Sequence, residues 1–181
     1  MTLTVVFFLL TVACENDLKD IKALSEKKPN VETVTNVVNY YSQQAKMKAK
    51  LTSPIMHHYQ TDSPYWEFPK SLHVDFYNDT LLIESQLNSR YGRFIENQRK
   101  VFLKDSVVVS NLKGDTLFCR ELWWDQQKQI FYTDKPVRIH QPDKIIYGIG
   151  LEAPQDFSSF NTTEAHGFFR VPKGFTDQGQ P

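Results

Sequence analysis

The stretch Lys113-Gly-Asp-Thr-Leu-Phe-Cys-Arg-Glu-Leu-Trp-Trp-Asp125 places a turn directly before an apolar, aromatic run. Gly114 can supply the positive φ that a tight turn requires, and the run that follows is rich in residue types that favour β-strands. Similar units flank this stretch at residues 100–109 and 129–139. The sequence therefore predicts a set of repeated β units, with this strand at its centre.

Strict alternation along the central strand would bury either Arg120 or Glu121, because each face of the strand would then carry one of these charges. A buried charge without a partner is costly. A β-bulge or a bend at Arg120-Glu121 removes the conflict, since an irregularity there changes the face on which the following side chains lie. Four side chains would then face inward: Leu117, Cys119, Leu122 and Trp124.

The repeat is visible when Val101-Phe-Leu-Lys-Asp-Ser is aligned with Ile130-Phe-Tyr-Thr-Asp-Lys. Asp134-Lys135-Pro136 predicts a second corner, after which Val137 and Ile139 face inward. β units at a fixed period indicate layers that stack along an axis and bury their apolar faces against each other. Such a stack leaves open edges, which must be capped or used for pairing.

Upstream segments also alternate between apolar and polar residues. Residues 36–41 and 46–51 are predicted to form a hairpin with one solvent-exposed face. Pro54, Pro64 and Pro69 predict short or edge strands and loops between residues 55 and 68. In the segment 71–77, three residues share one face, and three more continue it after a turn at Asn78-Asp79. These six residues are Leu72, Val74, Phe76, Leu81, Ile83 and Leu87. Many short strands without helical patterning predict an all-β sandwich, jelly roll or barrel.

The length and charge composition of the chain exclude several classes of function. The chain of 181 residues is long enough for one domain with a sizeable core. It holds 21 basic and 21 acidic residues, so it lacks the basic field of a nucleic-acid surface. His57 and His58 point to opposite faces of a strand and cannot readily chelate one metal together. Neither a metal nor a cofactor is expected.

The N-terminus predicts export. Residues 1–13 are uncharged and apolar, too short a run for a spanning helix of about 20 residues, and typical of a signal peptide. Cys14 follows directly and resembles the acylated cysteine of a bacterial lipoprotein. An ordinary cleaved signal or a buried strand are the alternatives.

Four segments follow from this interpretation. They are a signal peptide (1–13), a lipid-anchored tether (14–32) for which a short amphipathic helix is the alternative, a β domain (33–170) and a disordered polar tail (171–181).

Catalytic signals are missing from the sequence. It contains no Gly-x-Ser-x-Gly, zinc motif or glycine-rich phosphate loop. Cys119 reads as a small buried apolar residue rather than a nucleophile. We therefore expect no enzyme activity, and a secreted hydrolase is disfavoured.

An ordered series of short motifs gives the chain a family resemblance. The series consists of Gly114-Asp-Thr-Leu, Glu121-Leu, Trp124-Asp125, Thr133-Asp134, Pro136-Val137, Gly148-x-Gly-Leu-x-Ala153 and Asp156-Phe157. In these motifs the chain resembles the LptC (YrbK) family, the periplasmic component of lipopolysaccharide export, over residues 36–167. It departs from the better-known members, which carry a spanning helix where this chain has Cys14. Cys119 also stands where a small hydroxyl residue is common.

The resemblance implies a twisted open β jelly roll with an apolar groove for the acyl chains of lipopolysaccharide. It further implies that the lipid comes from an inner-membrane ABC transporter and passes to a periplasmic LptA-like bridge protein by pairing of edge strands. An aliphatic groove suffices for this task, because each buried CH₂ contributes about 0.8 kcal/mol.

Ten inward residues are expected to line this groove: Leu72, Val74, Phe76, Leu81, Ile83, Leu117, Leu122, Trp124, Val137 and Ile139. The alternative for each is ordinary core. For the whole protein, the alternative is a lipoprotein that acts as a structural or protein-binding β module of the cell envelope.

Overall fold

The computed structural model describes residues 30–169. The chain divides into two compact units, residues 1–30 and 31–181, and the described strands lie in the second, apart from the first residue of β1. The expected signal peptide, Cys14, most of the tether and the C-terminal tail lie outside the described residues. Among those described, no helix is both long enough and apolar enough to cross a membrane.

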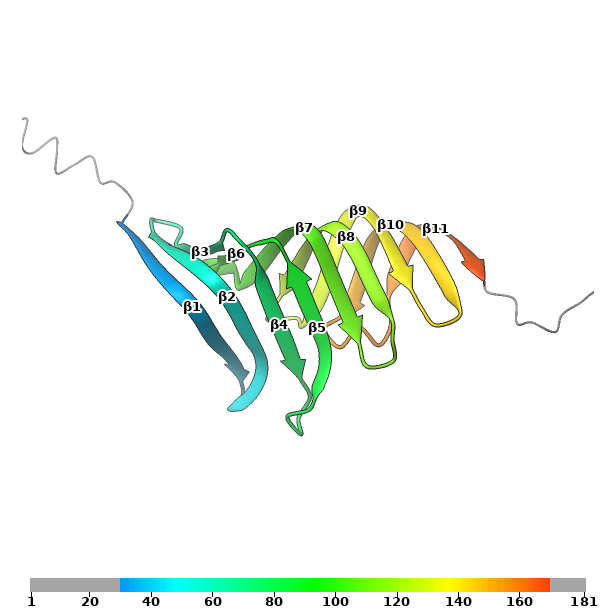
Figure 1. Cartoon of the computed structure of the whole chain (residues 1–181), viewed down its shortest axis with the longest axis horizontal. Helices are drawn as coiled ribbons and strands as arrows, with labels where there is room; N and C mark the ends of the chain where they lie inside the picture. Colours follow the sequence, from blue (N-terminus) through cyan, green and yellow to red (C-terminus); the bar gives the residue numbers. More distant parts are fainter. Residues whose placement is uncertain (1–29, 170–181) are drawn as a thin grey trace, which may run out of the picture. The chain divides into compact units, whose positions relative to one another are not determined.

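The described residues form one antiparallel sheet. Its strands, in chain order, are β1 (Asn30–Gln43), β2 (Lys46–Gln60), β3 (Tyr65–Phe68), β4 (Leu72–Tyr77), β5 (Ile83–Ser89), β6 (Tyr91–Ile95), β7 (Lys100–Asn111), β8 (Thr116–Asp125), β9 (Ile130–His140), β10 (Lys144–Pro154) and β11 (Asn161–Phe169). A single 3₁₀ turn, η2 (Glu96–Gln98), joins β6 to β7 within this part of the chain. The prediction of an all-β jelly roll is confirmed. Figure 1 shows the strands side by side, with β1 and β11 far apart in the β domain.

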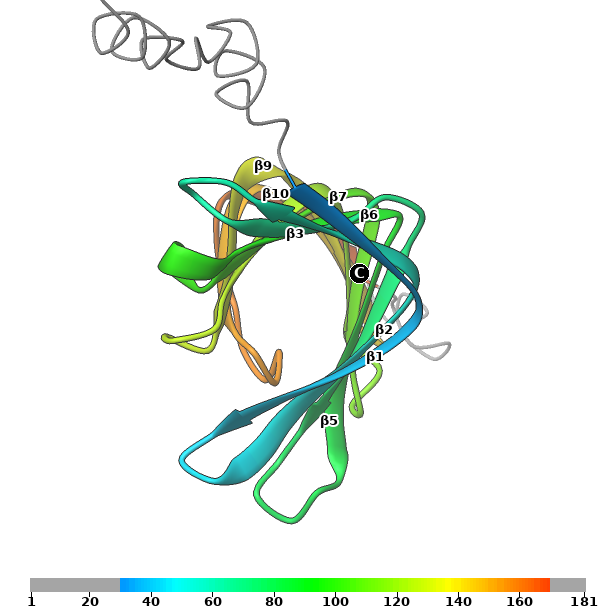
Figure 2. The ribbon, with the colours of Figure 1, turned by 90° about the vertical axis from the view of Figure 1, so that its left-hand side faces the viewer.

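The sheet folds over on itself, because its long strands change partners halfway along. β2 pairs with β4 through Ala49–Thr52 and then with β3 through His57–Tyr59. β7 pairs with β6 in its first half and with β5 in its second. The folded sheet thus has two walls, named here the β4–β5 wall and the β3–β6 wall. Figure 2 looks along the β domain and shows the strands curving around its interior.

The predicted bend in the central strand is confirmed. Arg120 is exposed, whereas the inward side chains before and after it are buried. The pairing register shifts on both sides of β8 at this point. The extra residues lie in β7 and β9, the strands on either side of β8. In β7 the residues at the bend are Asp105 and Ser106, both at positive φ (63° and 55°). A left-handed conformation at two successive residues turns the strand sharply.

The predicted repeat is also present in the three-dimensional structure. β7 and β9 flank β8 and cross the bend in the same direction. The aligned residues Asp105-Ser106 and Asp134-Lys135 both fall where the register shifts. The predicted corner at Asp134-Lys135-Pro136 is therefore confirmed, and Val137 and Ile139 beyond it are buried.

In the middle of the β domain, side chains from the two walls meet and fill the interior. The Phe76 ring of the β4–β5 wall lies 4.9 Å from the Trp124 ring and 5.5 Å from the Phe131 ring, both of the opposite wall. Both pairs are edge-to-face, the arrangement that aromatic quadrupoles favour. All three side chains are at most 2% exposed. This region is a packed core.

The segment after β10 closes the packed region on the side away from the bend. The Ser85 hydroxyl donates to the Gln155 carbonyl (2.6 Å), and the Asn111 amide donates to the Phe157 carbonyl (2.8 Å). The Trp124 indole N–H donates to the Gln155 side-chain oxygen at 3.2 Å. These bonds satisfy polar groups that would otherwise be costly to bury. The Phe157 side chain, 1% exposed, adds to the core.

Two predictions from the sequence, at Pro54 and at Leu81, are wrong. Pro54 does not end its strand, because β2 continues to Gln60; the proline lies at the bend, where β2 changes partners and regular ladder bonding is interrupted. Leu81 does not face inward. It is 57% exposed and has a φ of 63°, because the turn after β4 extends to Leu82, whose backbone N–H donates to the Asn78 side chain.

Candidate functional site

An apolar pocket of about 460 Å³ opens at the β1 end of the β domain, within the usual size range of small-molecule sites. Both walls contribute its apolar lining. The lining residues are Ala49, Leu51 and Val74 of the β4–β5 wall and Trp66, Phe68, Phe94, Val101 and Trp124 of the β3–β6 wall. Its rim is formed by the exposed or half-buried lining residues Asn39, Tyr40, Tyr41, Ser42, Glu96 and Arg99, and the buried Gln126 also lines it. The arrangement offers apolar burial with charged groups confined to the rim.

Strand parity explains why these side chains share one space. Trp66 and Phe68 are two residues apart on β3, and Trp66 pairs with Phe94 on β6. Since paired residues lie on the same face of a sheet, all three point inward. Leu51 pairs with Val74 on the opposite wall. Leu51, Trp66 and Phe94 are only partly buried, so the interior is less completely filled here than around Phe76.

Polar contacts tie together the turns at the rim of the pocket. The Tyr41 hydroxyl donates to the Gln126 carbonyl at 3.3 Å, and the Tyr41 ring meets the edge of Trp124. The Gln129 side-chain amide donates to the Gln43 side-chain oxygen. The turn between β1 and β2 is thus tied to the turn between β8 and β9, across the opening between the two walls.

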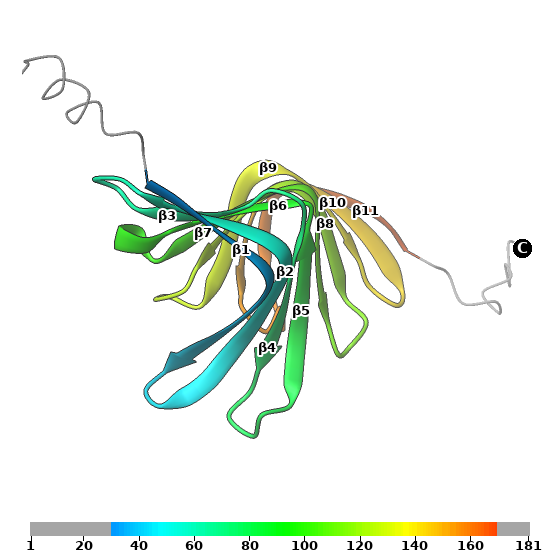
Figure 3. The same cartoon turned by 60° about the vertical axis from the view of Figure 1, so that its left-hand side comes forward.

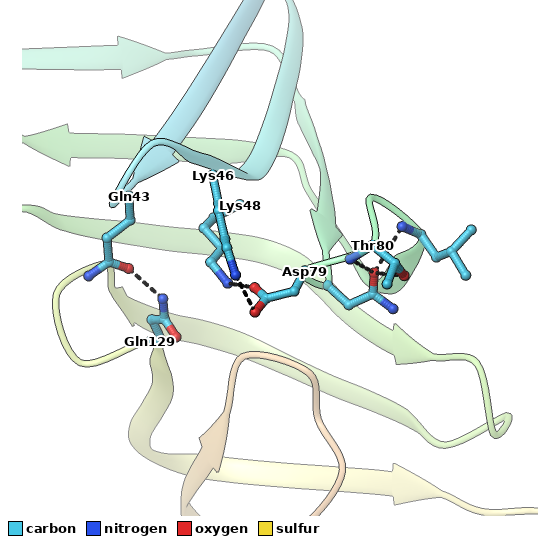
Figure 4. A network of polar contacts seen from close by, with 8 residues as sticks. Gln43, Lys46, Lys48, Asp79, Thr80 and Gln129 are labelled. Carbon is cyan, nitrogen blue, oxygen red and sulfur yellow. Dashed lines mark hydrogen bonds and ion pairs between the residues drawn. The ribbon is translucent and has the colours of Figure 1, made fainter.

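Asp79 extends this rim to the turn between β4 and β5. Its carboxylate lies 2.7 Å from the Lys46 ammonium and 2.8 Å from that of Lys48 (Figure 4). The two lysines lower the pKa of Asp79 to about 2. The carboxylate is well exposed, so the contact orders the turn without contributing much stability.

A second polar cluster lies on the other side of the opening. The Trp66 indole donates to the Glu96 carboxylate, and the Nε2 atom of His58 lies 3.0 Å from the same carboxylate. The Nδ1 atom of His58 lies 3.4 Å from Glu32 on β1. The carboxylate of Glu96 is therefore engaged by neighbouring side chains. The Arg99 guanidinium also lines the pocket, and no ion pair holds it within the described residues.

The ten residues predicted for the groove fall into three groups. Val74 and Trp124 line the pocket. Six more are buried, at most 4% exposed, and do not line this pocket: Leu72, Phe76, Leu117, Leu122, Val137 and Ile139. Ile83 is half-buried and Leu81 is exposed.

Sequence reasoning missed most of the pocket lining, notably Tyr41, Trp66, Phe68 and Phe94. A signal was present, because Trp66 and Phe68 alternate with polar neighbours as strand residues do. Because Pro64 and Pro69 flank these residues, the sequence favoured loops or short strands there instead.

The described residues offer little for catalysis. Burial raises the pKa of the Cys119 thiol to about 12, so it is not a thiolate at neutral pH and is a poor nucleophile. Burial and the hydrogen bond to Glu67 raise the pKa of Tyr91 to about 12. Residues 30–169 contain no group of three metal-ligating side chains.

Two edges of the sheet are open to pairing within the described strands. β1 pairs only with β2, and β11 pairs only with β10 (Figures 1 and 3). β1 runs for 14 residues, and it exposes Val34, Val38 and Tyr40. Unpaired backbone groups along a long strand are a template for adding another strand.

Comparison with known families gives one match. The family described as "Lipopolysaccharide-assembly, LptC-related" matches residues 2–161. That range covers β1 to β10 and the motifs from Gly114 to Phe157. Among curated proteins, no relative matches the chain. The single folded sheet agrees with the jelly roll that the resemblance implied. By its sequence and its all-β fold, the chain belongs to the LptC-related family and takes part in lipopolysaccharide transport.

Proposed function

We propose that the β domain is a non-covalent lipid carrier, which holds acyl chains of lipopolysaccharide in the apolar pocket at its β1 end. The observation that carries this proposal is the lining of the pocket, where aliphatic and aromatic side chains from both walls face a space of about 460 Å³. Each CH₂ of an acyl chain buried there would contribute about 0.8 kcal/mol. The charged groups Glu96 and Arg99 lie at the rim, where the polar part of an amphiphile would remain.

The pocket replaces most of the groove that the ten predicted residues would have formed. The side chains of Phe76, Leu117 and Leu122 already contact other core residues, so an acyl chain could reach them only by forcing the walls apart. Separating the walls would break the Phe76–Trp124 and Phe76–Phe131 ring contacts. We therefore assign the entering acyl chains to the pocket end, with Val74 and Trp124 as its innermost predicted residues.

The two open edges suit the transfer that the family resemblance implies. The lipid would arrive from an inner-membrane ABC transporter and leave to an LptA-like bridge protein, with edge strands of the partners pairing to β1 and β11. β1 borders the pocket through Asn39 and Tyr41, so a partner paired to β1 would continue the walls of the pocket into its own fold. A lipid anchor at Cys14, outside the described residues, would keep the protein at the inner membrane, on its periplasmic side.

Photo-crosslinking in intact cells tests this proposal. A photoreactive residue in place of Trp66 should capture lipopolysaccharide, because Trp66 lines the pocket. The same residue in place of Leu112, which is 77% exposed in the turn between β7 and β8, is the matched control and should capture none. Equal capture from both positions, or none from Trp66 in a folded protein, would contradict the carrier function.

The packed middle of the β domain favours a second candidate, a structural or protein-binding module of the envelope. In that case the pocket would be a surface for a protein side chain. Crosslinks from Trp66 would then join a protein of defined mass and would not depend on lipopolysaccharide synthesis.

A further inference from the structure

A cluster of cations lies at the bend and shares no lining residue with the lipid pocket. Lys70, Arg90, Lys104 and Arg120 line one cleft of about 770 Å³. They come from four different segments: the β3–β4 loop, the link from β5 to β6, β7 and β8. We name this cavity the bend cleft. Its position follows from the bend itself, because the register shifts at Asp105-Ser106 and Arg120 interrupt the regular sheet there.

Within residues 30–169, the four cations have no acidic side chain as an ion-pair partner. No carboxylate of the described residues lies within the 4.0 Å ion-pair distance of their side-chain nitrogens, although other lysines and arginines of the domain have such partners. The Lys104 ammonium lies over the Tyr91 ring at 5.0 Å, so an aromatic face holds it rather than a carboxylate. Asp105 is the single acidic residue that lines the cleft. Four cations thus share one space with one carboxylate.

This arrangement is unusual for a chain with zero formal net charge. Like charges that converge on one cleft repel each other, and the repulsion is relieved when an anion binds between them. We propose that the bend cleft binds a phosphate group. A phosphate monoester carries a charge of about −1.5 to −2 on three acceptor oxygens, which two guanidinium forks and two ammonium groups can share.

A phosphate fits the cleft better than an acidic peptide does. In an extended peptide, carboxylates on the same face lie about 7 Å apart, so they would spread along a surface. Here the cations instead line a single cleft. The neighbouring cleft of about 870 Å³ leaves room for the remainder of a phosphorylated molecule. It shares Lys104, Asp105 and Arg120 with the bend cleft and adds Glu121, Lys135 and Arg138.

Backbone amide resonances of the full chain in a zwitterionic detergent test the proposal. Inorganic phosphate should shift the signals of Asp105, Ser106 and Arg120 saturably, and pyrophosphate should do so at lower concentration. Chloride at equal ionic strength should not. Equal shifts with chloride, or shifts that never saturate, would mean that the cleft only screens salt and would overturn the proposal.

Matched charge variants sharpen the test. The double variant Arg90→Gln and Arg120→Gln should weaken phosphate binding at least about ten-fold, since each lost charge-assisted hydrogen bond is worth roughly that factor or more. Lys113→Gln with Lys128→Gln removes equal charge from exposed turns elsewhere and should change binding less than about two-fold. Equal weakening by both double variants would overturn the proposal. The Arg90/Arg120 variant should also unfold at the same temperature as the parent or higher, because it relieves repulsion.

The source of the phosphate is settled by a second arm of the experiment. Bicelles that contain phosphatidic acid should bind more tightly than free phosphate if the ligand is a lipid headgroup, and no more tightly if it is soluble. Either result supports a phosphate site. Saturable binding of a poly-glutamate peptide without any binding of phosphate would instead make the cleft a surface for an acidic protein. The outcome is independent of lipid capture at Trp66, so the two proposals can fail separately.

Discussion

The middle and the β1 end of one folded sheet differ in how their walls meet. In the middle, Phe76 of β4, Trp124 of β8 and Phe131 of β9 interlock across the interior, and the segment after β10 closes the side. At the β1 end, Leu51, Trp66 and Phe94 face a pocket and are only partly buried. Both regions carry the same apolar alternation. The comparison shows that inward-facing residues supply stability where the walls touch, and leave room for a ligand where they do not.

The largest expected effect is a difference in unfolding free energy between variants of the two regions. Phe76→Ala should lower the free energy of unfolding by about 3–5 kcal/mol, because it removes a fully buried ring from both of its partners. Phe94→Ala should cost only about 1 kcal/mol, since its ring is half-buried beside the pocket. Chemical denaturation of both variants measures the difference. Equal losses would mean that the pocket end is packed as tightly as the middle.

A charged side chain in the pocket should reduce lipid binding without unfolding the protein. Leu51→Glu should reduce lipopolysaccharide capture at Trp66 by roughly ten-fold or more, because an acyl chain would have to share its space with a desolvated carboxylate. The partly open site lets that carboxylate reach water, so the variant should remain folded. Leu122→Glu, with the same chemistry in the packed region, should fail to fold. Circular dichroism and crosslinking together distinguish these outcomes, and normal capture by Leu51→Glu would remove the pocket from the lipid path.

A smaller effect concerns the rim. Tyr41→Phe removes the hydroxyl that donates to the Gln126 carbonyl and keeps the ring against Trp124. It should cost about 1 kcal/mol of stability, the usual net value of a hydrogen bond. Lipid exchange should become faster, because the two turns are then held mainly by Gln43 and Gln129. Unchanged exchange would show that this contact does not limit access.

The smallest effect is a pH dependence at the exposed turn. Because the two lysines favour its charged form, Asp79 has a pKa of about 2, below the ordinary value of 3.8 for this carboxyl group. Its ion pairs should therefore be intact at neutral pH and be lost as the pH falls through about 2. A carboxyl-carbon NMR titration should give that midpoint in the parent. Lys46→Ala with Lys48→Ala should raise it toward 3.8, and an unchanged midpoint would contradict the pairing.

Much of the fold could be read from local sequence. The conflict between Arg120 and Glu121 predicted the bend in β8, because the cost of burying a charge outweighs strict alternation. The alignment of 101–106 with 130–135 predicted that β7 and β9 are equivalent. Leu81 shows the limit of such reasoning. Its apolar side chain continued an alternating pattern, but the Asn78 side chain forms a longer turn that places Leu81 in solvent.

The candidate site was predictable only in part. Val74 and Trp124 were expected to line the groove and do line the pocket, whereas Leu117 and Ile139 are enclosed core. All four residues have the same inward parity, so sequence alone could not separate them. The bend cleft could not be predicted from the sequence either, because Lys70, Arg90 and Arg120 are far apart in the chain and individually resemble ordinary surface residues.

The sequence by itself determined the all-β class, the bend at Arg120, and membership of the LptC-related family. These depend on alternation, turn residues and short motifs, which are local properties of the chain. Only the tertiary structure decided that the interior is filled around Phe76 and open beside Trp66, and that four cations share the bend cleft. An empty space depends on the summed volumes of side chains from strands distant in sequence, and no local pattern encodes that sum.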